Sequence, residues 1–165
     1  MGGKNMSLKQ YSNDEMIAKY GKPNQSGTYL VSAKIPFPLV IAWDKSQTVS
    51  RIRCHRLEVE NVTAIFQDIL NEYGLDKIKS LGIDLYGGCF NFRKMRGGTS
   101  WSRHSWGTAI DLDPERNQLK ESKKTARFAR PEYSKMIDIF ESHGWLSLGR
   151  TRDYDWMHFE SGRKV

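Results

Sequence analysis

The sequence predicts an α+β domain in which two or three helices pack on a small, mainly antiparallel sheet. Two observations support this fold class. Apolar residues recur at helical spacing in some segments, whereas other short segments alternate apolar and polar residues, as half-buried strands do. A chain of 165 residues forms one domain, or one domain with an extension. We place an N-terminal extension at residues 1–50, packed on a second unit that spans residues 51–165.

Three segments carry helix signals. Ser12 and Glu15 have the spacing of a capping box and open a short first helix. Apolar residues at three- and four-residue spacing predict a second helix over 59–73, with Gly74 just beyond its end. The third helix is expected over 131–143, because a proline stands in its first turn and a glycine follows it.

Short strands are expected at 28–33, 39–43, 83–86, 89–93 and 110–113, and around residue 158. The strand at 110–113 is the most informative. Its alternation directs Ile110 and Leu112 into the core. Asp111 then shares the opposite face with Ala109, whose small side chain leaves room beside the carboxylate.

The stretch from Ser102 to Asp111 carries the first chemical signal. It holds an imidazole, His104, and a carboxylate, Asp111, with Gly107 between them to let the chain turn. A nitrogen and an oxygen ligand suit zinc, but a site needs a third ligand. The chain has only four histidines, and His158 lies in an aromatic-rich run near its end. Two histidines and one aspartate, with water in the fourth position, are typical of a catalytic zinc site.

A catalytic zinc site also needs a base. Zinc lowers the pKa of its bound water to about 7, and a nearby carboxylate can take the proton during attack on a carbonyl. Asp155 is the candidate base, although residues three apart point to opposite faces of a strand. Asp155 can therefore reach the same metal only if it lies in a bend before the strand. Glu160, two residues after His158, shares a face of the strand with it and is the rival base.

Two motifs carry a family resemblance: Ser102-x-His104-x-x-Gly107-x-Ala109-x-Asp111 and Asp155-x-x-His158. Together they resemble the zinc peptidases that include D-alanyl-D-alanine carboxypeptidases, dipeptidases and phage L-alanyl-D-glutamate endopeptidases. The Hedgehog signalling domain is similar to these enzymes in fold. The resemblance implies that His104, Asp111 and His158 bind zinc. It places the catalytic carboxylate at Asp155, where many members have glutamate and some phage enzymes have aspartate.

The resemblance also implies an arginine upstream of the first motif, and Arg93 is its match. Peptidoglycan stem peptides are rich in carboxylates, which a guanidinium binds in a bidentate manner. Arg93 is therefore expected to hold a substrate carboxylate or to polarise the scissile carbonyl. Arg96, Ser102 and Trp106 complete the expected substrate-binding set. For Arg96 a solvated loop charge is the alternative, and for Trp106 the alternative is a place in the core.

Composition limits the partners. The formal net charge of +7 suits nucleic acid or an anionic polymer such as the cell wall. Because Lys and Arg are spread along the chain rather than gathered in one helix or platform, no nucleic-acid partner is expected. No apolar run reaches the roughly 20 residues that a membrane-spanning helix needs, so membrane insertion is not expected. Two cysteines, Cys54 and Cys89, do not make a disulfide framework.

Together with these features, the family resemblance implies zinc-dependent hydrolysis of a peptide bond in bacterial peptidoglycan, with Zn²⁺ as cofactor and residues 51–165 as the peptidase domain. The first residues lack the apolar segment of a secretory signal. We therefore expect a monomer that is made in the host cytoplasm and acts on the wall after release. This pattern favours a phage or prophage endolysin that cleaves the L-Ala-D-Glu bond over a D-Ala-D-Ala carboxypeptidase. Two alternatives from other classes are a non-catalytic, zinc-containing module that binds the cell wall and a basic nucleic-acid-binding protein.

Overall fold

The computed structural model describes residues 7–165. Its strands are β1 (Leu8–Gln10), β2 (Leu30–Ile41), β3 (Thr48–His55), β4 (Leu85–Gly88), β5 (Ala109–Leu112), β6 (Trp145–Ser147) and β7 (His158–Lys164). Its α-helices are α1 (Asn13–Tyr20), α2 (Val59–Leu81), α3 (Ser134–Ser142) and α4 (Leu148–Arg152). Short 3-10 helices are η1 (Arg56–Glu58), η2 (Arg103–Trp106), η3 (Pro114–Arg116), η4 (Arg127–Ala129) and η5 (Pro131–Tyr133).

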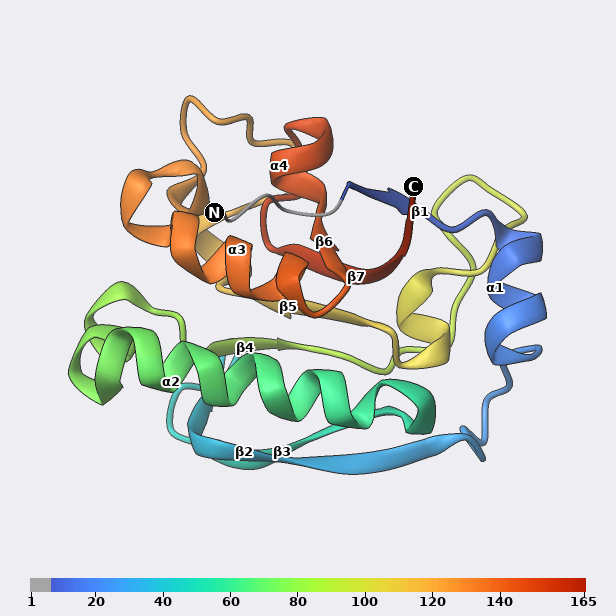
Figure 1. Ribbon diagram of the computed structural model, residues 1–165, viewed down its shortest axis with the longest axis horizontal. Helices are drawn as coiled ribbons and strands as arrows, with labels where there is room; N and C mark the ends of the chain where they lie inside the picture. Colours follow the sequence, from blue (N-terminus) through green and yellow to red (C-terminus); the bar gives the residue numbers. More distant parts are fainter. Residues whose placement is uncertain (1–6) are drawn as a thin grey trace.

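The seven strands form one sheet in the order β1-β7-β5-β4-β2-β3, and β6 pairs with β7. Among the strand pairs of the described residues, only β2 and β4 run parallel, so the predicted α+β class with a mainly antiparallel sheet is confirmed. Figure 1 shows α2 lying along the β2–β3 hairpin and α3 beside the part of the sheet that contains β5, β6 and β7. The structure has four α-helices where two or three were expected, because the short helix α4 follows β6.

The helix predicted over 59–73 does end at Gly74, whose φ of 77° and ψ of 158° are non-helical; α2 is longer only because a second helical segment resumes after it. Two strand predictions were wrong. Strand β2 is continuous where two strands were expected, because its register with β3 shifts between Lys34 and Leu39 and accommodates two prolines there. Residues 89–93 form no strand, because their backbone bonds mainly to η2: Asn91 donates to the carbonyl of His104.

The core lies between the sheet and the helices α2 and α3. Ile110 and Leu112 of β5 are completely buried in it, as the alternation predicts. Phe159 of β7 stacks on Phe140 of α3 with ring centroids 4.0 Å apart. One face of the β5–β7 pair therefore faces an apolar interior, which leaves the other face for polar side chains.

The described part of residues 1–50 is built into the same sheet as the rest of the chain. It supplies β1, α1, β2 and the first residues of β3, and the boundary proposed after position 50 lies inside β3. Residues 1–6 of the proposed extension lie outside the described residues. Strand β1 pairs with β7, and α1 lies beside η2 at one end of the molecule (Figure 1).

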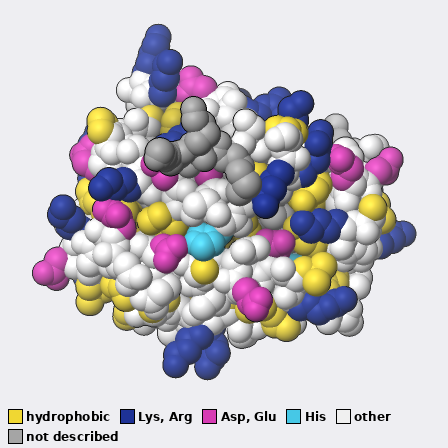
Figure 2. Space-filling model, viewed as in Figure 1, with side chains coloured by type: hydrophobic (Ala, Val, Ile, Leu, Met, Phe, Trp, Pro, Cys, Tyr) yellow, Lys and Arg dark blue, Asp and Glu magenta, His cyan; other side chains and the backbone are white. Residues whose placement is uncertain are grey.

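Charged side chains of both signs are spread over the face of the molecule shown in Figure 2. Figure 2 shows Lys and Arg side chains on one face interspersed with Asp and Glu, rather than gathered in one patch. That face offers no continuous basic platform of the kind that nucleic-acid binding uses. Within residues 7–165, none of the helices combines the length and apolar character that a membrane crossing requires. Cys54 and Cys89 are both buried, and neither forms a disulfide. Burial raises the pKa of the Cys54 thiol to about 12.

Gly107 is a position where the fold requires glycine. Its φ of 71° is left-handed, and an added Cβ would lie 2.6 Å from Leu30 Cδ2 and 2.9 Å from the backbone nitrogen of His55. We expect Gly107→Ala to lower the free energy of unfolding by about 2–4 kcal/mol, because backbone strain and steric overlap both act. Urea unfolding followed by circular dichroism measures this loss.

Gly97→Ala is the matched control for that substitution. Gly97 has a similar φ of 73°, but nothing lies within 4 Å of the added Cβ. Its loss should reflect backbone strain alone, about 1–2 kcal/mol. Equal losses in the two variants would contradict the importance of the close approach at Gly107.

Candidate metal centre

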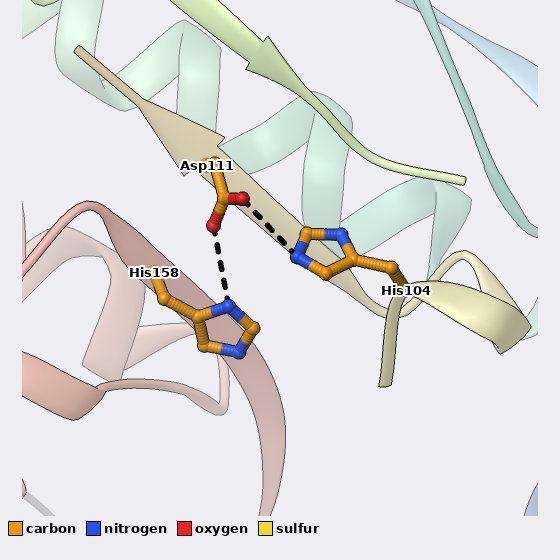
Figure 3. A group of neighbouring side chains, drawn as sticks. All are labelled: His104, Asp111 and His158. Atoms are coloured by element: carbon orange, nitrogen blue, oxygen red, sulfur yellow. Dashed lines mark hydrogen bonds and ion pairs between the residues drawn. The ribbon is translucent and has the colours of Figure 1, made fainter. Parts of the chain in front are cut away.

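Three side chains from distant parts of the chain meet on the polar face of the sheet. His104 comes from η2, Asp111 from β5 and His158 from β7, and one ligand atom of each lies within 4.8 Å of the others. His104 Nε2 is 3.3 Å from Asp111 Oδ2, and His158 Nδ1 is 3.2 Å from Asp111 Oδ1. Figure 3 shows both imidazoles turned toward the carboxylate. The structure thus brings together all three residues predicted as zinc ligands.

Strand register explains two of the three positions. Asp111 and His158 are direct partners in the antiparallel β5–β7 pair, so their side chains project from the same face. The neighbouring pair, Ile110 and Phe159, projects into the core. A slip of one residue would move both polar side chains to the apolar side.

The η2 turn supplies the third position. Ser102 caps this turn by accepting a hydrogen bond from the backbone nitrogen of His104 at 3.2 Å. Gly107 ends it in a left-handed conformation, and its backbone N–H donates to the carbonyl oxygens of Arg103 and His104. Both ends of the turn that carries His104 are therefore fixed before β5 begins.

The outer nitrogen of each imidazole also has a partner. His104 Nδ1 is 2.7 Å from the carbonyl oxygen of Cys89, and His158 Nε2 is 2.8 Å from Glu160 Oε1. Carbonyl and carboxylate oxygens accept hydrogen bonds, so these outer nitrogens carry the protons. His104 Nε2 and His158 Nδ1, the nitrogens that face Asp111, are then the ones whose lone pairs can bind a metal, as in metal-binding histidines. The donor set of two imidazoles and one carboxylate therefore fits zinc.

The electrostatics of the cluster favour a cation. Burial opposes ionisation of Asp111, but the two neighbouring imidazoles outweigh it and lower its pKa. Burial likewise opposes ionisation of Glu160, but its hydrogen bond to His158 lowers its pKa. For His158, burial disfavours the charged form, but the hydrogen bonds to the two carboxylates raise its pKa. Two ionised carboxylates thus surround one imidazole and stabilise positive charge there.

Asp155 lies beside the cluster, in a bend before β7. Its φ of 52° is left-handed, and its Oδ2 is 3.9 Å from His158 Nδ1. The backbone N–H of Asp155 donates to the carbonyl of Leu119, which ties the bend to the neighbouring loop. Burial raises the pKa of Asp155, as suits a group that takes and returns a proton. The bend that a base at this position requires is present; the catalytic role stays a prediction.

Glu160 lies in a different environment from the one expected of a rival base. Its side chain is 2% exposed and contacts His158 on the side away from Asp111. It cannot reach a substrate at the cluster without displacing that imidazole. The structure therefore contradicts Glu160 as the alternative base and makes it a partner of His158.

Arg93 and Arg96 lie on an exposed loop next to η2. The backbone of Arg93 is fixed to the motif, since its N–H donates to Ser105 Oγ and its carbonyl accepts from the N–H of Ser102. Its guanidinium is exposed and donates to the carbonyl of Lys94 at 3.5 Å. No hydrogen bond or ion pair among the described residues joins either arginine to the cluster. Their substrate-binding roles stay predictions.

The predicted substrate-binding roles of Ser102 and Trp106 are wrong. Ser102 is buried, and its hydroxyl is engaged in capping η2. Trp106 is completely buried against Met16 and Tyr20, and its Nε1–H donates to the carbonyl of Gly21 at 2.6 Å. Neither side chain is free to meet a ligand, because the packing of α1 covers this part of the motif.

Two contributors to the site went unnoticed in the sequence. One is the carbonyl of Cys89, which no side-chain pattern reveals. The other is Gln10, whose Nε2 donates to Glu160 Oε2 at 3.3 Å across 150 positions of sequence. The partnership of Glu160 with His158 had a signal, because residues two apart in a strand share a face.

The buried position of Trp106 leads to a stability prediction. Trp106→Phe removes the hydrogen bond to Gly21 and part of the ring that packs against Met16 and Tyr20. We expect the free energy of unfolding to fall by about 1–3 kcal/mol, as measured by urea unfolding followed by circular dichroism. Trp43→Phe is the control, because Trp43 is 71% exposed and its replacement should change stability little. Unchanged stability in Trp106→Phe would contradict a core role.

The comparisons with known proteins indicate the same general class of protein as the site does. Residues 96–161 match the sequence model of a family described as D-alanyl-D-alanine carboxypeptidase. The matched stretch is about two fifths of the chain and contains the cluster together with Asp155. No curated protein and no solved structure matches the chain. The family match supports a metallopeptidase of bacterial cell-wall peptides as the general class.

Proposed function

We propose that this chain is a zinc-dependent peptidase that cleaves a stem-peptide bond of peptidoglycan, as an endolysin of the L-Ala-D-Glu endopeptidase type does. One observation carries the proposal. His104, Asp111 and His158 converge on one point, and the carboxylate of Asp155 lies beside them. Residues suited to hold a metal and a carboxylate suited to act as base thus lie together, and all four fall within the segment that matches a peptidase family.

The three converging side chains would hold the metal through His104 Nε2, a carboxylate oxygen of Asp111 and His158 Nδ1. When bound, Zn²⁺ supplies a Lewis acid that polarises a carbonyl oxygen and makes water more acidic. The carbonyl of Cys89 and the carboxylate of Glu160 keep the two imidazoles in the tautomers that zinc requires.

The remaining residues act on protons and on the substrate. Asp155 removes a proton from the attacking water and returns it to the amine that leaves. Burial raises the pKa of Asp155 above its usual range, and this supports both steps because a more basic carboxylate takes up a proton more readily. Arg93, whose guanidinium is exposed next to the motif, pairs with a carboxylate of the stem peptide.

Two features support the endopeptidase as the first choice. The base position holds aspartate, as in some phage members of the family that the motifs resemble. The net charge of +7 favours approach to an anionic wall polymer. A D-Ala-D-Ala carboxypeptidase is the second candidate, and the description of the matching family favours it.

Digestion of purified peptidoglycan distinguishes these functions. The chain is incubated with the polymer, with a chelator, and with chelator followed by zinc, and soluble products are identified by mass. An L-Ala-D-Glu endopeptidase releases peptides that begin with D-glutamate, whereas a carboxypeptidase releases free D-alanine. We expect the first product set, lost with chelator and restored by zinc. Absence of any product after zinc addition would contradict the proposed peptidase and leave the non-catalytic wall-binding module.

A further inference from the structure

We propose that Glu160 is a positioning residue for the metal ligand His158, and that Gln10 of the N-terminal strand holds Glu160 in place. This inference rests on the proposed function of the metal centre and adds to it a structural role for the first described strand. It makes β1 part of the support of the site.

The first contact joins Glu160 to the metal ligand His158. The carboxylate is buried, and its Oε1 accepts a hydrogen bond from His158 Nε2 at 2.8 Å. A buried carboxylate is costly unless charged or hydrogen-bonding partners compensate for its lost hydration. The imidazole supplies such a partner, and the carboxylate in turn fixes the proton on Nε2 and the lone pair on Nδ1.

The sheet provides space for this carboxylate. Glu160 lies two residues after His158 in β7, so both side chains share one face. Directly opposite Glu160 in the β5–β7 register is Ala109, whose methyl group leaves room for the longer side chain. The alanine of the first motif thus accommodates the partner of a ligand in the second motif.

The second contact joins Gln10 to Glu160. Strand β1 pairs with β7 so that Gln10 lies opposite Gly162. The Oε1 atom of Gln10 accepts from Arg152 Nη1 at 2.8 Å, and its Nε2 donates to Glu160 Oε2 at 3.3 Å. Because Arg152 occupies the amide oxygen, the amide nitrogen is directed at Glu160. The result is a hydrogen-bonded chain from Arg152 on α4 through Gln10 and Glu160 to His158.

This chain determines how well the imidazole is prepared for the metal. Both oxygens of Glu160 are engaged, one by the ligand and one by the N-terminal strand. Loss of the first contact would free His158 to rotate or to carry its proton on Nδ1, the atom that faces Asp111. Loss of a partner of this kind lowers metal affinity by about 10- to 100-fold in metal sites generally.

Zinc affinity of the full chain, measured by competition with a chromogenic chelator, tests the inference. Glu160→Gln should weaken zinc binding by about 10- to 100-fold, and Gln10→Ala by roughly 2- to 10-fold through loss of one hydrogen bond. Lys9→Ala is the matched control, because Lys9 is exposed on the same strand and should leave affinity unchanged. The visible absorption of the cobalt-substituted chain should change in Glu160→Gln, which a loss of general stability alone would not cause.

The outcomes separate this inference from the proposed function. Wild-type zinc affinity and an unchanged cobalt spectrum in a folded Glu160→Gln variant would overturn the inference, whatever the activity. If Glu160→Gln does not fold, Gln10→Ala decides in the same assay, and unchanged affinity there overturns the inference. A wild-type chain that binds zinc but releases no peptidoglycan fragment contradicts only the proposed function, since the affinity ratios still test the role of Glu160.

Discussion

Asp155→Asn is expected to lower the turnover of peptidoglycan by about 100- to 10,000-fold while zinc stays bound. Asparagine has nearly the same shape as aspartate and tolerates the left-handed φ of 52° at this position, so the bend should persist. It cannot take up the proton that the reaction transfers. Because Asp155 lies outside the three converging ligands, metal content should not change. The measurement is the rate of fragment release together with the zinc content of the purified variant.

Asp153→Asn is the matched control for this loss. Asp153 also has a left-handed φ, of 56°, but is exposed and accepts hydrogen bonds that an asparagine oxygen can accept as well. Its replacement should leave turnover near the wild-type level. Full turnover in Asp155→Asn would place the base elsewhere, and loss of zinc would make Asp155 a ligand.

The second large effect is expected from Asp111→Asn, which should weaken zinc binding by roughly 100-fold or more and reduce turnover with it. Asp111 contributes the one carboxylate of the cluster, and its two oxygens lie 3.3 and 3.2 Å from the facing nitrogens of His104 and His158. A neutral amide removes the charge that attracts the cation and places a donor nitrogen where an acceptor is needed. Competition with a chelator measures the affinity, and circular dichroism verifies the fold.

Asp113→Asn is the matched control for Asp111→Asn. Asp113 lies two positions away and is more deeply buried than Asp111, but its carboxylate pairs with Arg116 at 2.7 Å rather than with the histidines. Its substitution should reduce stability and leave zinc affinity unchanged. Similar losses of zinc in both variants would show that disruption of this region, rather than loss of a ligand, explains the effect of Asp111→Asn.

The residues that sequence patterns could locate are those whose signals are local. His104, Gly107 and Asp111 lie within one short motif, and the alternation around Asp111 correctly placed Ile110 in the core. The scarcity of histidines led to His158, because the chain has only four. The requirement for a bend at Asp155 followed from the two-residue period of strands.

The residues that were misjudged depend on contacts between distant segments. Ser102 and Trp106 were expected in a substrate cleft, but capping and the packing of α1 enclose them. Nothing local in the sequence marks Gln10, because its partner lies on a strand at the other end of the chain. The prolines of β2 suggested a break, and only the register shift against β3 explains why the strand continues.

Strand β7 pairs with β1, β5 and β6, and it is the last strand in chain order. Long-range strand pairing is slow to form, because the intervening chain must first be brought together. A refolding or newly made chain therefore has only part of the ligand set until this final strand docks. His104, Asp111 and His158 therefore come together as a proposed metal site only when β7 completes its pairing with β5.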